Sequence, residues 1–181
     1  MTDPEEAIQS DRFVLEPLLV GHADLLFDDL LHPRLYDYVP SDPPASREAL
    51  RLTYERWVRR RSADGAEVWY NYALKALRGA VYVGTLQATL RPEGDSLIAY
   101  QVFPRFWRTG IATEGVSAMM HALAAGGVTR FVAQVDTRNV ASQRLLASLG
   151  FALVRRIDEA DFFKGARSDE FEYERVMTGL H

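Results

Sequence analysis

The sequence predicts one domain of the α/β (α+β) class, with a mixed, mostly antiparallel central sheet of about seven strands flanked by about four helices. Residues 67–103 alternate between polar and apolar side chains in three runs separated by two short turn segments, which indicates an antiparallel meander. Residues 110–135 then change to a helical period followed by a strand, which predicts a crossover to a parallel neighbour. A length of 181 residues fits a single domain over 1–181.

The first third of the chain is expected to form one strand and two helices. Residues 12–18 alternate as a strand does, and residues 21–32 carry leucines at helical spacing. Four prolines then interrupt the chain over residues 33–44, before a second helix over 46–61 that opens with a capping serine. We expect the basic run RWVRRR (56–61) in this helix to form a solvated face.

The rest of the chain is expected to add two helices and six strands. The helix after Gly110 presents one apolar stripe and ends at a pair of glycines. Asn139 is placed to cap a second, shorter helix that Gly150 closes, with Phe151 folded back against its last turn. The predicted strands are 67–77, 80–90, 96–103, 130–135, 152–157 and 170–176, with a loop over 158–169 between the last two.

The composition excludes several classes of function. There is no cysteine, so disulfides, thiolate nucleophiles, Cys-ligated zinc and a covalent thioester relay are excluded. The net charge of −4 argues against nucleic acid as a partner, and no apolar run approaches the roughly 18 residues of a membrane span. With an acidic, polar start, these features predict a cytoplasmic protein that does not bind membranes. No metal is expected, because the four histidines lack metal-ligand spacing: His22, His32, His121 and His181.

The stretch FPRFWRTGIATEG (103–115) joins the third strand of the meander to the helix that follows. The first turn of a helix has about four amide hydrogens without intrahelical acceptors and about half a positive charge, so it can bind a phosphate. Gly110 would let the backbone approach an anion, Ala112 keeps the next position small, and Arg105 and Arg108 add positive charge. The alternative is that Gly110 only turns the chain and that both arginines face water.

A dinucleotide-binding oxidoreductase would also have such a turn. Residues 110–115, GIATEG, nearly match the Gly-x-Gly-x-x-Gly fingerprint of that class, with Asp136 as a candidate ribose ligand. In those folds the fingerprint follows the first strand of a parallel run, whereas about a hundred residues with a meander precede it here. The context therefore disfavours this hypothesis, which stays a remote alternative.

WRTGIA (107–112) and NVASQRLLASLGF (139–151) resemble the motifs of a known family. The first is similar to the Gln/Arg-x-x-Gly-x-Gly/Ala motif of the GNAT superfamily of acyl-CoA N-acyltransferases, with Trp107 in the Gln/Arg place. In PRFWRTGIATEG (104–115) that variation resembles the branch of ribosomal-protein N-terminal (alanine and serine) acetyltransferases, although Arg108 stands where this branch often has glycine. The second motif is similar to the Asn-x-x-Ser…Leu-Gly-Phe segment of the same branch.

The resemblance implies acetyl-CoA as a co-substrate. By analogy, the backbone amides of residues 107–112 and the Thr113 hydroxyl would hold its pyrophosphate. A splayed bulge after residues 101–103 would pair with the pantetheine arm, which Asn139 would also contact unless it serves only as a helix cap. The implied cofactor-binding residues are Val102, Phe103, Trp107, Arg108, Thr109, Gly110, Ile111, Ala112, Thr113, Asn139 and Ser142.

The resemblance also implies catalytic groups for direct attack of an amine on the thioester in a ternary complex. The tyrosine that most GNAT enzymes carry about seven residues after the Asn is Leu146 here. Ser142 is therefore the expected hydrogen-bond donor to the departing thiolate, unless it only satisfies a backbone group in the first helical turn. Asp161 is the expected base, because its segment resembles the C-terminal hairpin that carries the base in this branch. Other acids expected near the cleft are Glu93, Asp95 and Glu159, and a water relay is a further alternative.

The acceptor is expected to be a primary amine, either a protein or peptide N-terminus or a small molecule. Segment 33–44 lines the substrate side in this superfamily, and its aromatic and acidic residues suit a cationic amine, with plain packing as the alternative. The expected substrate-binding residues are His32, Tyr36, Tyr38 and Tyr100. A non-catalytic acyl-CoA sensor of the same fold is the alternative to an enzyme, and the sequence is compatible with an oligomer.

Overall fold

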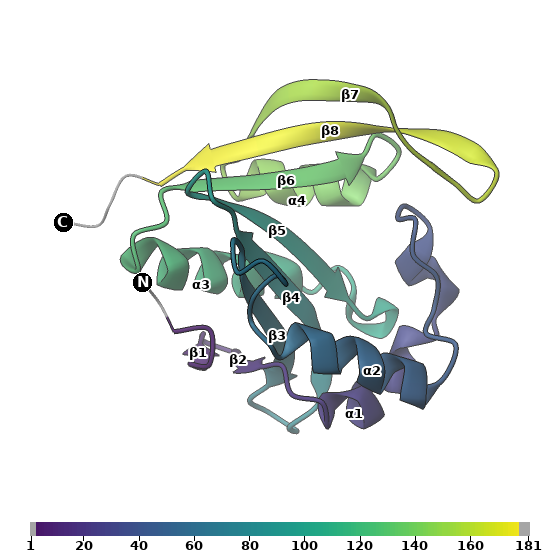
Figure 1. Cartoon of the computed structure of the whole chain (residues 1–181), viewed down its shortest axis with the longest axis vertical. Helices are drawn as coiled ribbons and strands as arrows, with labels where there is room; N and C mark the ends of the chain where they lie inside the picture. The colour runs from purple at the N-terminus through teal and green to yellow at the C-terminus, as the bar shows by residue number, and fades with distance from the viewer. Residues whose placement is uncertain (1–2, 178–181) are drawn as a thin grey trace.

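The computed structural model describes residues 3–177, which form one eight-stranded sheet with helices on both faces (Figure 1). The strand order is β1-β2-β3-β4-β5-β6-β8-β7, and all neighbouring strands are antiparallel except β5 and β6. The strands are β1 (Ile8–Gln9), β2 (Phe13–Pro17), β3 (Val68–Ala76), β4 (Tyr82–Leu90), β5 (Asp95–Val102), β6 (Arg130–Asp136), β7 (Ala152–Phe163) and β8 (Ala166–Val176). The helices are α1 (His22–Leu30), α2 (Arg47–Trp57), α3 (Ile111–Ala125) and α4 (Val140–Ser148), with short 3-10 turns at Pro33–Tyr36 and Pro104–Phe106. The predicted meander, crossover and four helices are confirmed.

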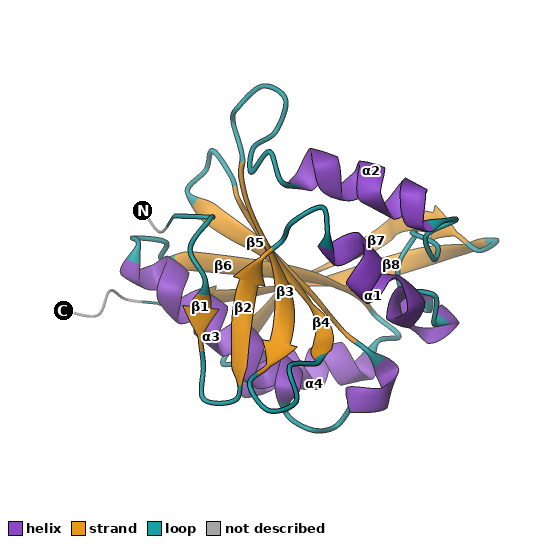
Figure 2. Cartoon of the chain, turned by 90° about the horizontal axis from the view of Figure 1, so that it is seen from below, coloured by secondary structure: helices purple, strands orange, loops and turns teal. Residues whose placement is uncertain are grey.

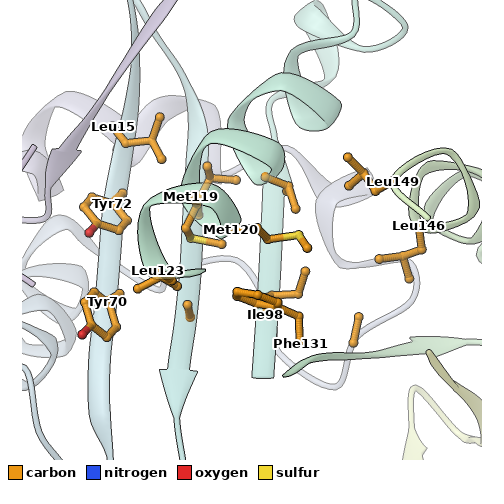
Figure 3. Packing of buried hydrophobic residues seen from close by; sticks show 14 of the residues in the cluster. Leu15, Tyr70, Tyr72, Ile98, Met119, Met120, Leu123, Phe131, Leu146 and Leu149 are labelled. Carbon is orange, nitrogen blue, oxygen red and sulfur yellow. The ribbon is translucent and has the colours of Figure 1, made fainter. Parts of the chain in front are cut away.

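Helices α3 and α4 cover one face of the sheet, and α1 and α2 cover the other (Figure 2). On the first face, Met119 and Met120 of α3 and Leu146 of α4 pack with Tyr72 and Phe131 of the strands (Figure 3). The smaller cluster on the other face consists of Leu18, Ala23, Leu26, Leu30, Leu50, Tyr54, Ala73 and Phe103. Because successive strand residues point to opposite faces, β3 contributes to both clusters, with Tyr72 in the first and Ala73 in the second.

Two glycines determine where α3 begins and how closely it lies against the sheet. Gly110 precedes the helix in the left-handed region with φ 77°, a conformation that residues with a Cβ rarely adopt. A Cβ on Gly115 would lie 3.0 Å from a methyl of Leu86 and 3.3 Å from a methyl of Leu74. Glycine at position 115 therefore lets the helix approach β3 and β4 closely.

The predicted helix caps are confirmed. The Ser46 hydroxyl accepts a hydrogen bond from the Ala49 amide at 3.0 Å, and the Asn139 side chain accepts one from the Ser142 amide at 3.1 Å. Gly150 adopts φ 78° after α4, and Phe151 is buried in the main core. Each cap satisfies a helix-end group that would otherwise lack a partner.

The strand predictions needed two corrections. A short strand, β1, precedes the first expected strand and brings the total to eight, because the two residues Ile8 and Gln9 are too few to show a period. The predicted loop over 158–169 is mostly strand, since β7 and β8 extend to a turn at Lys164 and Gly165. These arms are largely exposed, so the apolar alternation that signals a strand is missing.

The basic run of residues 56–61 is solvated at Arg56, Arg59 and Arg61, as predicted, but it does not form one helical face and Arg60 departs from it. Helix α2 ends at Trp57, and Arg60 is only 7% exposed, with φ 60°. Its guanidinium donates to the Leu18 carbonyl at 2.7 Å, which joins the end of β2 to the end of α2. Within residues 3–177, no helix is long and apolar enough to cross a membrane.

Candidate active site

The two parallel strands at the centre of the sheet separate soon after they begin. Pairing of β5 with β6 covers only residues 95–97 and 130–132, and the strands then diverge, as Figure 1 shows. The predicted bulge after residues 101–103 is absent, because β4 and β5 keep a continuous register up to Gly84 and Val102. The opening comes instead from the divergence of β5 and β6, which leaves residues 98–102 of β5 unpaired on that side.

A row of free amides lies at the carboxyl end of β5. Among residues 3–177, no hydrogen-bond acceptor contacts the backbone N–H groups of residues 108–113. Arg108 and Gly110 have φ angles of 63° and 77°, and alternating left- and right-handed residues turn successive amides toward one point, as in anion-binding nests. The Trp107 amide is not part of this set, because it donates to the Pro104 carbonyl.

These amides fit a phosphate group of acetyl-CoA. They belong to the loop and the first turn of α3, where the helix dipole favours an anion. A Cβ on Gly110 would have one neighbour within 4 Å, an Arg12 side-chain nitrogen at 3.5 Å, so the backbone is open to a ligand. Residues 108–113 would therefore hold the pyrophosphate.

Arg12, the residue before β2, supports this loop, and no local pattern indicated that role. Its guanidinium donates to the Thr109 carbonyl at 3.1 Å and to Glu114 in the first turn of α3 at 2.5 Å. Burial acts to raise the pKa of Glu114, but hydrogen bonds from Arg12 and Ser10 outweigh it and lower the pKa. The partner is 102 residues away, so local patterns cannot reveal it. Arg105 pairs with Asp29 at 2.8 Å instead of facing the loop.

Ser142 and Tyr100 meet where β5 has separated from β6. The Ser142 hydroxyl lies 2.5 Å from the Tyr100 hydroxyl, which joins the first turn of α4 to β5. Burial raises the pKa of Tyr100 to about 12, although the hydrogen bond with Ser142 acts in the opposite direction. Leu146, in the place of the missing tyrosine, is fully buried. The structure thus brings Tyr100, predicted to bind substrate, next to the predicted thiolate donor.

The other predicted acceptor residues lie in the segment after α1. Tyr36 is buried and donates to the Leu30 carbonyl at 2.8 Å, and His32 accepts from the Arg34 amide as a cap of the 3-10 turn. Tyr38 is exposed. The Lys164 ammonium donates to the carbonyls of Tyr36 and Val39, so the β7–β8 turn meets this segment.

The acids near this hairpin differ in how they are paired. Asp161 on β7 lies opposite Ser168 of β8 and is partly buried. Glu159 pairs with Arg167, so it is not free. Glu93 and Asp95 were wrongly expected near the cleft, because they lie at the amino end of β5, opposite to residues 108–113, and Asp95 pairs with Arg91 at 2.5 Å. The predicted base Asp161 keeps a carboxylate without a cationic partner in the part of the chain that the structure describes.

Glu170 is an acid that the sequence analysis missed. It follows Ser168 on the same face of β8 and is partly buried, and its carboxylate has no hydrogen-bond or ionic partner among the described residues. Burial raises the pKa of Glu170, and the nearby charges of Asp161, Asp136 and Glu172 raise it further. Its position beside Asp161 follows from the β7–β8 pairing, which the predicted loop did not contain. No group of three or more metal-ligating side chains occurs within residues 3–177.

Two diverging strands, a row of free amides at an adjoining helix end and a hydroxyl pair in the opening define an acyl-CoA-dependent acyltransferase. A family model described as acetyltransferase (GNAT) domain matches residues 12–152, and the chain belongs to this family. The predicted fold, the class of acetyl-CoA-dependent N-acetyltransferase and acetyl-CoA as co-substrate are confirmed. The dinucleotide alternative is excluded, because within residues 3–177 the sheet has one parallel pair, β5 and β6, in place of a parallel run.

Among curated proteins, YoaA of Bacillus subtilis (strain 168), an uncharacterized N-acetyltransferase, is 42% identical to this chain over 55 residues. That match covers 30% of this chain and 31% of the relative, so it spans less than a third of the relative's length.

Several solved structures share the fold over nearly the whole chain. RimL, a ribosomal-protein α-N-acetyltransferase in complex with coenzyme A, has a TM-score of 0.84 at 21% identity, covering 95% of this chain and 98% of RimL. An acetyltransferase from Salmonella typhimurium that modifies the N-terminal serine of a ribosomal protein has a TM-score of 0.83 at 21% identity, covering 96% of this chain and 100% of its own. A probable GNAT acetyltransferase from Chromobacterium violaceum has a TM-score of 0.83 at 22% identity, covering 97% of this chain and 88% of its own. The predicted branch is thus represented among the structures with this fold.

Proposed function

We propose that this protein transfers the acetyl group of acetyl-CoA to the α-amine of a protein or peptide N-terminus, by direct attack in a ternary complex. The observation that carries the proposal is the Ser142 hydroxyl, which lies 2.5 Å from the Tyr100 hydroxyl where β5 has separated from β6. The carboxyl end of β5 leads into the free amides of residues 108–113. Direct attack fits a chain without cysteine, which has no thiol to carry the acetyl group. We place the reaction in the cytoplasm, as the composition predicts.

The residues of the site have separate tasks in this proposal. Acetyl-CoA, when bound, supplies a thioester whose acetyl carbon accepts the amine. The amides of residues 108–113 bind the pyrophosphate, with Thr113 beside them, and the backbone of β5 up to Val102, which β6 leaves unpaired, is open to the arm. The Phe103 side chain is fully buried and the Asn139 side chain caps α4, so neither is needed for the cofactor. Ser142 donates a hydrogen bond to the departing sulfur, and Asp161 takes a proton from the amine, directly or through water.

The acids at the hairpin support an α-amine as the acceptor. At pH 7 an α-amine of pKa about 8 is roughly 10% neutral, whereas a lysine side chain of pKa about 10.4 is roughly 0.04% neutral. A carboxylate is a weak base, so it suits the acceptor that needs less help with deprotonation. His32, the imidazole of the acceptor segment, already accepts a hydrogen bond from the Arg34 amide. Tyr36 and Tyr38 would shape the entrance.

The names of similar proteins support the same acceptor class. Two of the solved neighbours act on the N-terminus of a ribosomal protein according to their descriptions. A small-molecule amine is the competing acceptor, and an acyl-CoA sensor without turnover is the competing function.

The test compares two blocked forms of one peptide, Ser-Gly-Ala-Gly-Lys-Trp, with a set of small primary amines. One form has a free α-amine and a blocked lysine, and the other has the reverse. Release of coenzyme A thiol measures turnover, and the absence of cysteine from the protein keeps this signal clean. Faster turnover of the free α-amine supports the proposal, faster turnover of a small amine refutes the acceptor, and acetyl-CoA binding without any turnover supports the sensor.

Catalytic variants complete this test. Ser142→Ala and Asp161→Asn should each lower turnover about tenfold or more while acetyl-CoA affinity stays close to that of the wild type. Asp158→Asn is the matched control, because Asp158 is an exposed acid of the same strand that pairs with Arg156. If neither catalytic variant slows turnover of a good acceptor, the assigned roles are wrong.

A further inference from the structure

We propose that Tyr100 is a positioning residue that donates its hydroxyl hydrogen to Ser142 and so directs the Ser142 hydrogen toward the departing sulfur. The inference rests on the proposed function and deepens it, since it assigns a second hydroxyl to the same site. The resemblance to the family placed Tyr100 with the acceptor, and the tyrosine expected on α4 is replaced by Leu146. The structure supplies a tyrosine from β5 instead.

The contact joins two elements that are fixed independently. Tyr100 lies on β5 beyond the last residue paired with β6, and Ser142 lies in the first turn of α4. Their oxygens are 2.5 Å apart, within the range of a strong hydroxyl hydrogen bond. The Asn139 side chain holds the Ser142 amide at 3.1 Å, which fixes the serine backbone without using its hydroxyl.

Either oxygen can be the donor, and we assign the donor role to Tyr100, whose hydroxyl also donates to the Ser142 carbonyl at 3.5 Å. Each hydroxyl has one hydrogen to donate and can accept others. If Ser142 donated to Tyr100, no hydrogen would be left on Ser142 for the sulfur. If Tyr100 donates, the Ser142 hydrogen is free, and a donor chain of two hydroxyls polarises the terminal one. Because burial raises the pKa of Tyr100 to about 12, its phenol stays protonated at neutral pH.

In the reaction, Tyr100 only orients the Ser142 hydroxyl and does not lose its own proton. As the bond between the acetyl carbon and the sulfur breaks, its electron pair goes to the sulfur, the amine nitrogen loses one proton to the base, and the sulfur gains one from solvent. An alkyl thiol has a pKa of about 8.5, so a phenol near 12 is too weak an acid to protonate its thiolate. Tyr100 therefore acts through Ser142, whose hydrogen bond stabilises the thiolate.

The test measures the pKa of the coenzyme A thiol in its complex with the protein. Calorimetric titration in buffers of different ionisation enthalpy counts the protons released on binding between pH 6 and 9. The same titration with desulfo-coenzyme A, which has no thiol, is subtracted. This readout needs neither an acceptor nor turnover, and the chain contributes no thiol of its own.

We expect the bound thiol of the wild type to have a lower pKa than free coenzyme A. Tyr100→Phe and Ser142→Ala should each raise it by about one to two pH units, from the worth of a hydrogen bond to a charged group, and the double variant should add nothing further. Turnover should fall about tenfold in each. Tyr72→Phe is the control, because it removes a buried hydroxyl without a partner from the same core and should leave the thiol pKa unchanged.

An unchanged thiol pKa in Tyr100→Phe, or effects of the two single variants that add independently, would overturn the proposal. Failure of coenzyme A to bind the wild type would overturn it as well. The proposed function fails differently, when the wild type binds acetyl-CoA but acetylates no amine. Comparing wild-type turnover with the thiol pKa of Tyr100→Phe therefore separates the two failures.

Discussion

Replacing Asp136 with asparagine should change how the stability of this fold depends on pH. Asp136 ends β6, is 4% exposed, and accepts hydrogen bonds from Arg138 and from the Ser168 hydroxyl at 2.6 Å. Burial alone would raise the pKa of this carboxyl, but the hydrogen bonds from Arg138 and Ser168 outweigh it and lower the pKa from 3.8 to about 2. The ionised form is therefore more favourable in the folded protein than in the unfolded chain.

The magnitude follows from these two values. A difference of about 1.8 pH units, at about 1.36 kcal/mol each, gives up to about 2 kcal/mol of unfolding free energy. Because the folded pKa is depressed, this contribution is complete above the unfolded value of 3.8 and is lost as the pH falls toward 2. About half of it should be gone near pH 3, midway between the two values.

Urea unfolding of the wild type and Asp136→Asn at pH 7, 5, 4 and 3 measures the effect. The difference in unfolding free energy should be constant between pH 7 and 5 and then shrink by about 1 kcal/mol at pH 3. Asp158→Asn, which removes an exposed acid paired with Arg156, should give a small difference with little pH dependence. A difference for Asp136→Asn that stays flat down to pH 3 would refute the reasoning.

Three further substitutions test other parts of the fold. In Gly84→Ala the new Cβ would lie 2.2 Å from the Gln101 carbonyl oxygen, so urea titration should show a loss of about 3 kcal/mol of unfolding free energy. Gly115→Ala should lose less, because its nearest atoms are flexible leucine methyls at 3.0 and 3.3 Å. Equal losses for the two variants would contradict this reasoning. Arg108 has φ 63°, a conformation that glycine adopts easily and valine does not. The unfolding free energy of Arg108→Gly should therefore stay within about 0.5 kcal/mol of the wild-type value, whereas Arg108→Val should lose at least about 1 kcal/mol. The opposite order would show that the φ angle does not matter. Burial and nearby acids raise the pKa of Glu170, so its ionised form destabilises the folded protein once the pH is above the pKa of this group in the unfolded chain. Glu170→Gln should therefore raise the melting temperature at pH 7 but not at pH 4. A rise of equal size at both pH values would contradict the predicted direction of this pKa shift.

The parts of the fold that local patterns determine were predictable. Period-two alternation identified the meander, because each of its strands has one face against the core. The caps at Ser46 and Asn139 were also predictable, because a cap and the amide that it satisfies are three residues apart. The amides around Gly110 followed from the motif at the start of α3.

Contacts between distant segments could not be read from local patterns. Arg60 is buried because the Leu18 carbonyl, 42 residues away, accepts its hydrogen bond, and a basic run in isolation looks solvated. Tyr100 and Ser142 are also 42 residues apart, and only the packing of α4 beside β5 brings them together. Glu170 was missed because the β7–β8 hairpin is exposed and lacks the alternation of a strand.

The central claim is that the amides of residues 108–113 bind the pyrophosphate of acetyl-CoA, and calorimetric titration tests it most directly. The wild type should bind acetyl-CoA at one site, and Gly110→Trp should lose at least about tenfold in affinity, because a large side chain would stand over the free amides. Gly94→Trp is the matched control, since Gly94 also has a positive φ and open space around it but lies in the turn between β4 and β5. Binding unaffected by Gly110→Trp, or weakened equally by Gly94→Trp, would contradict the claim.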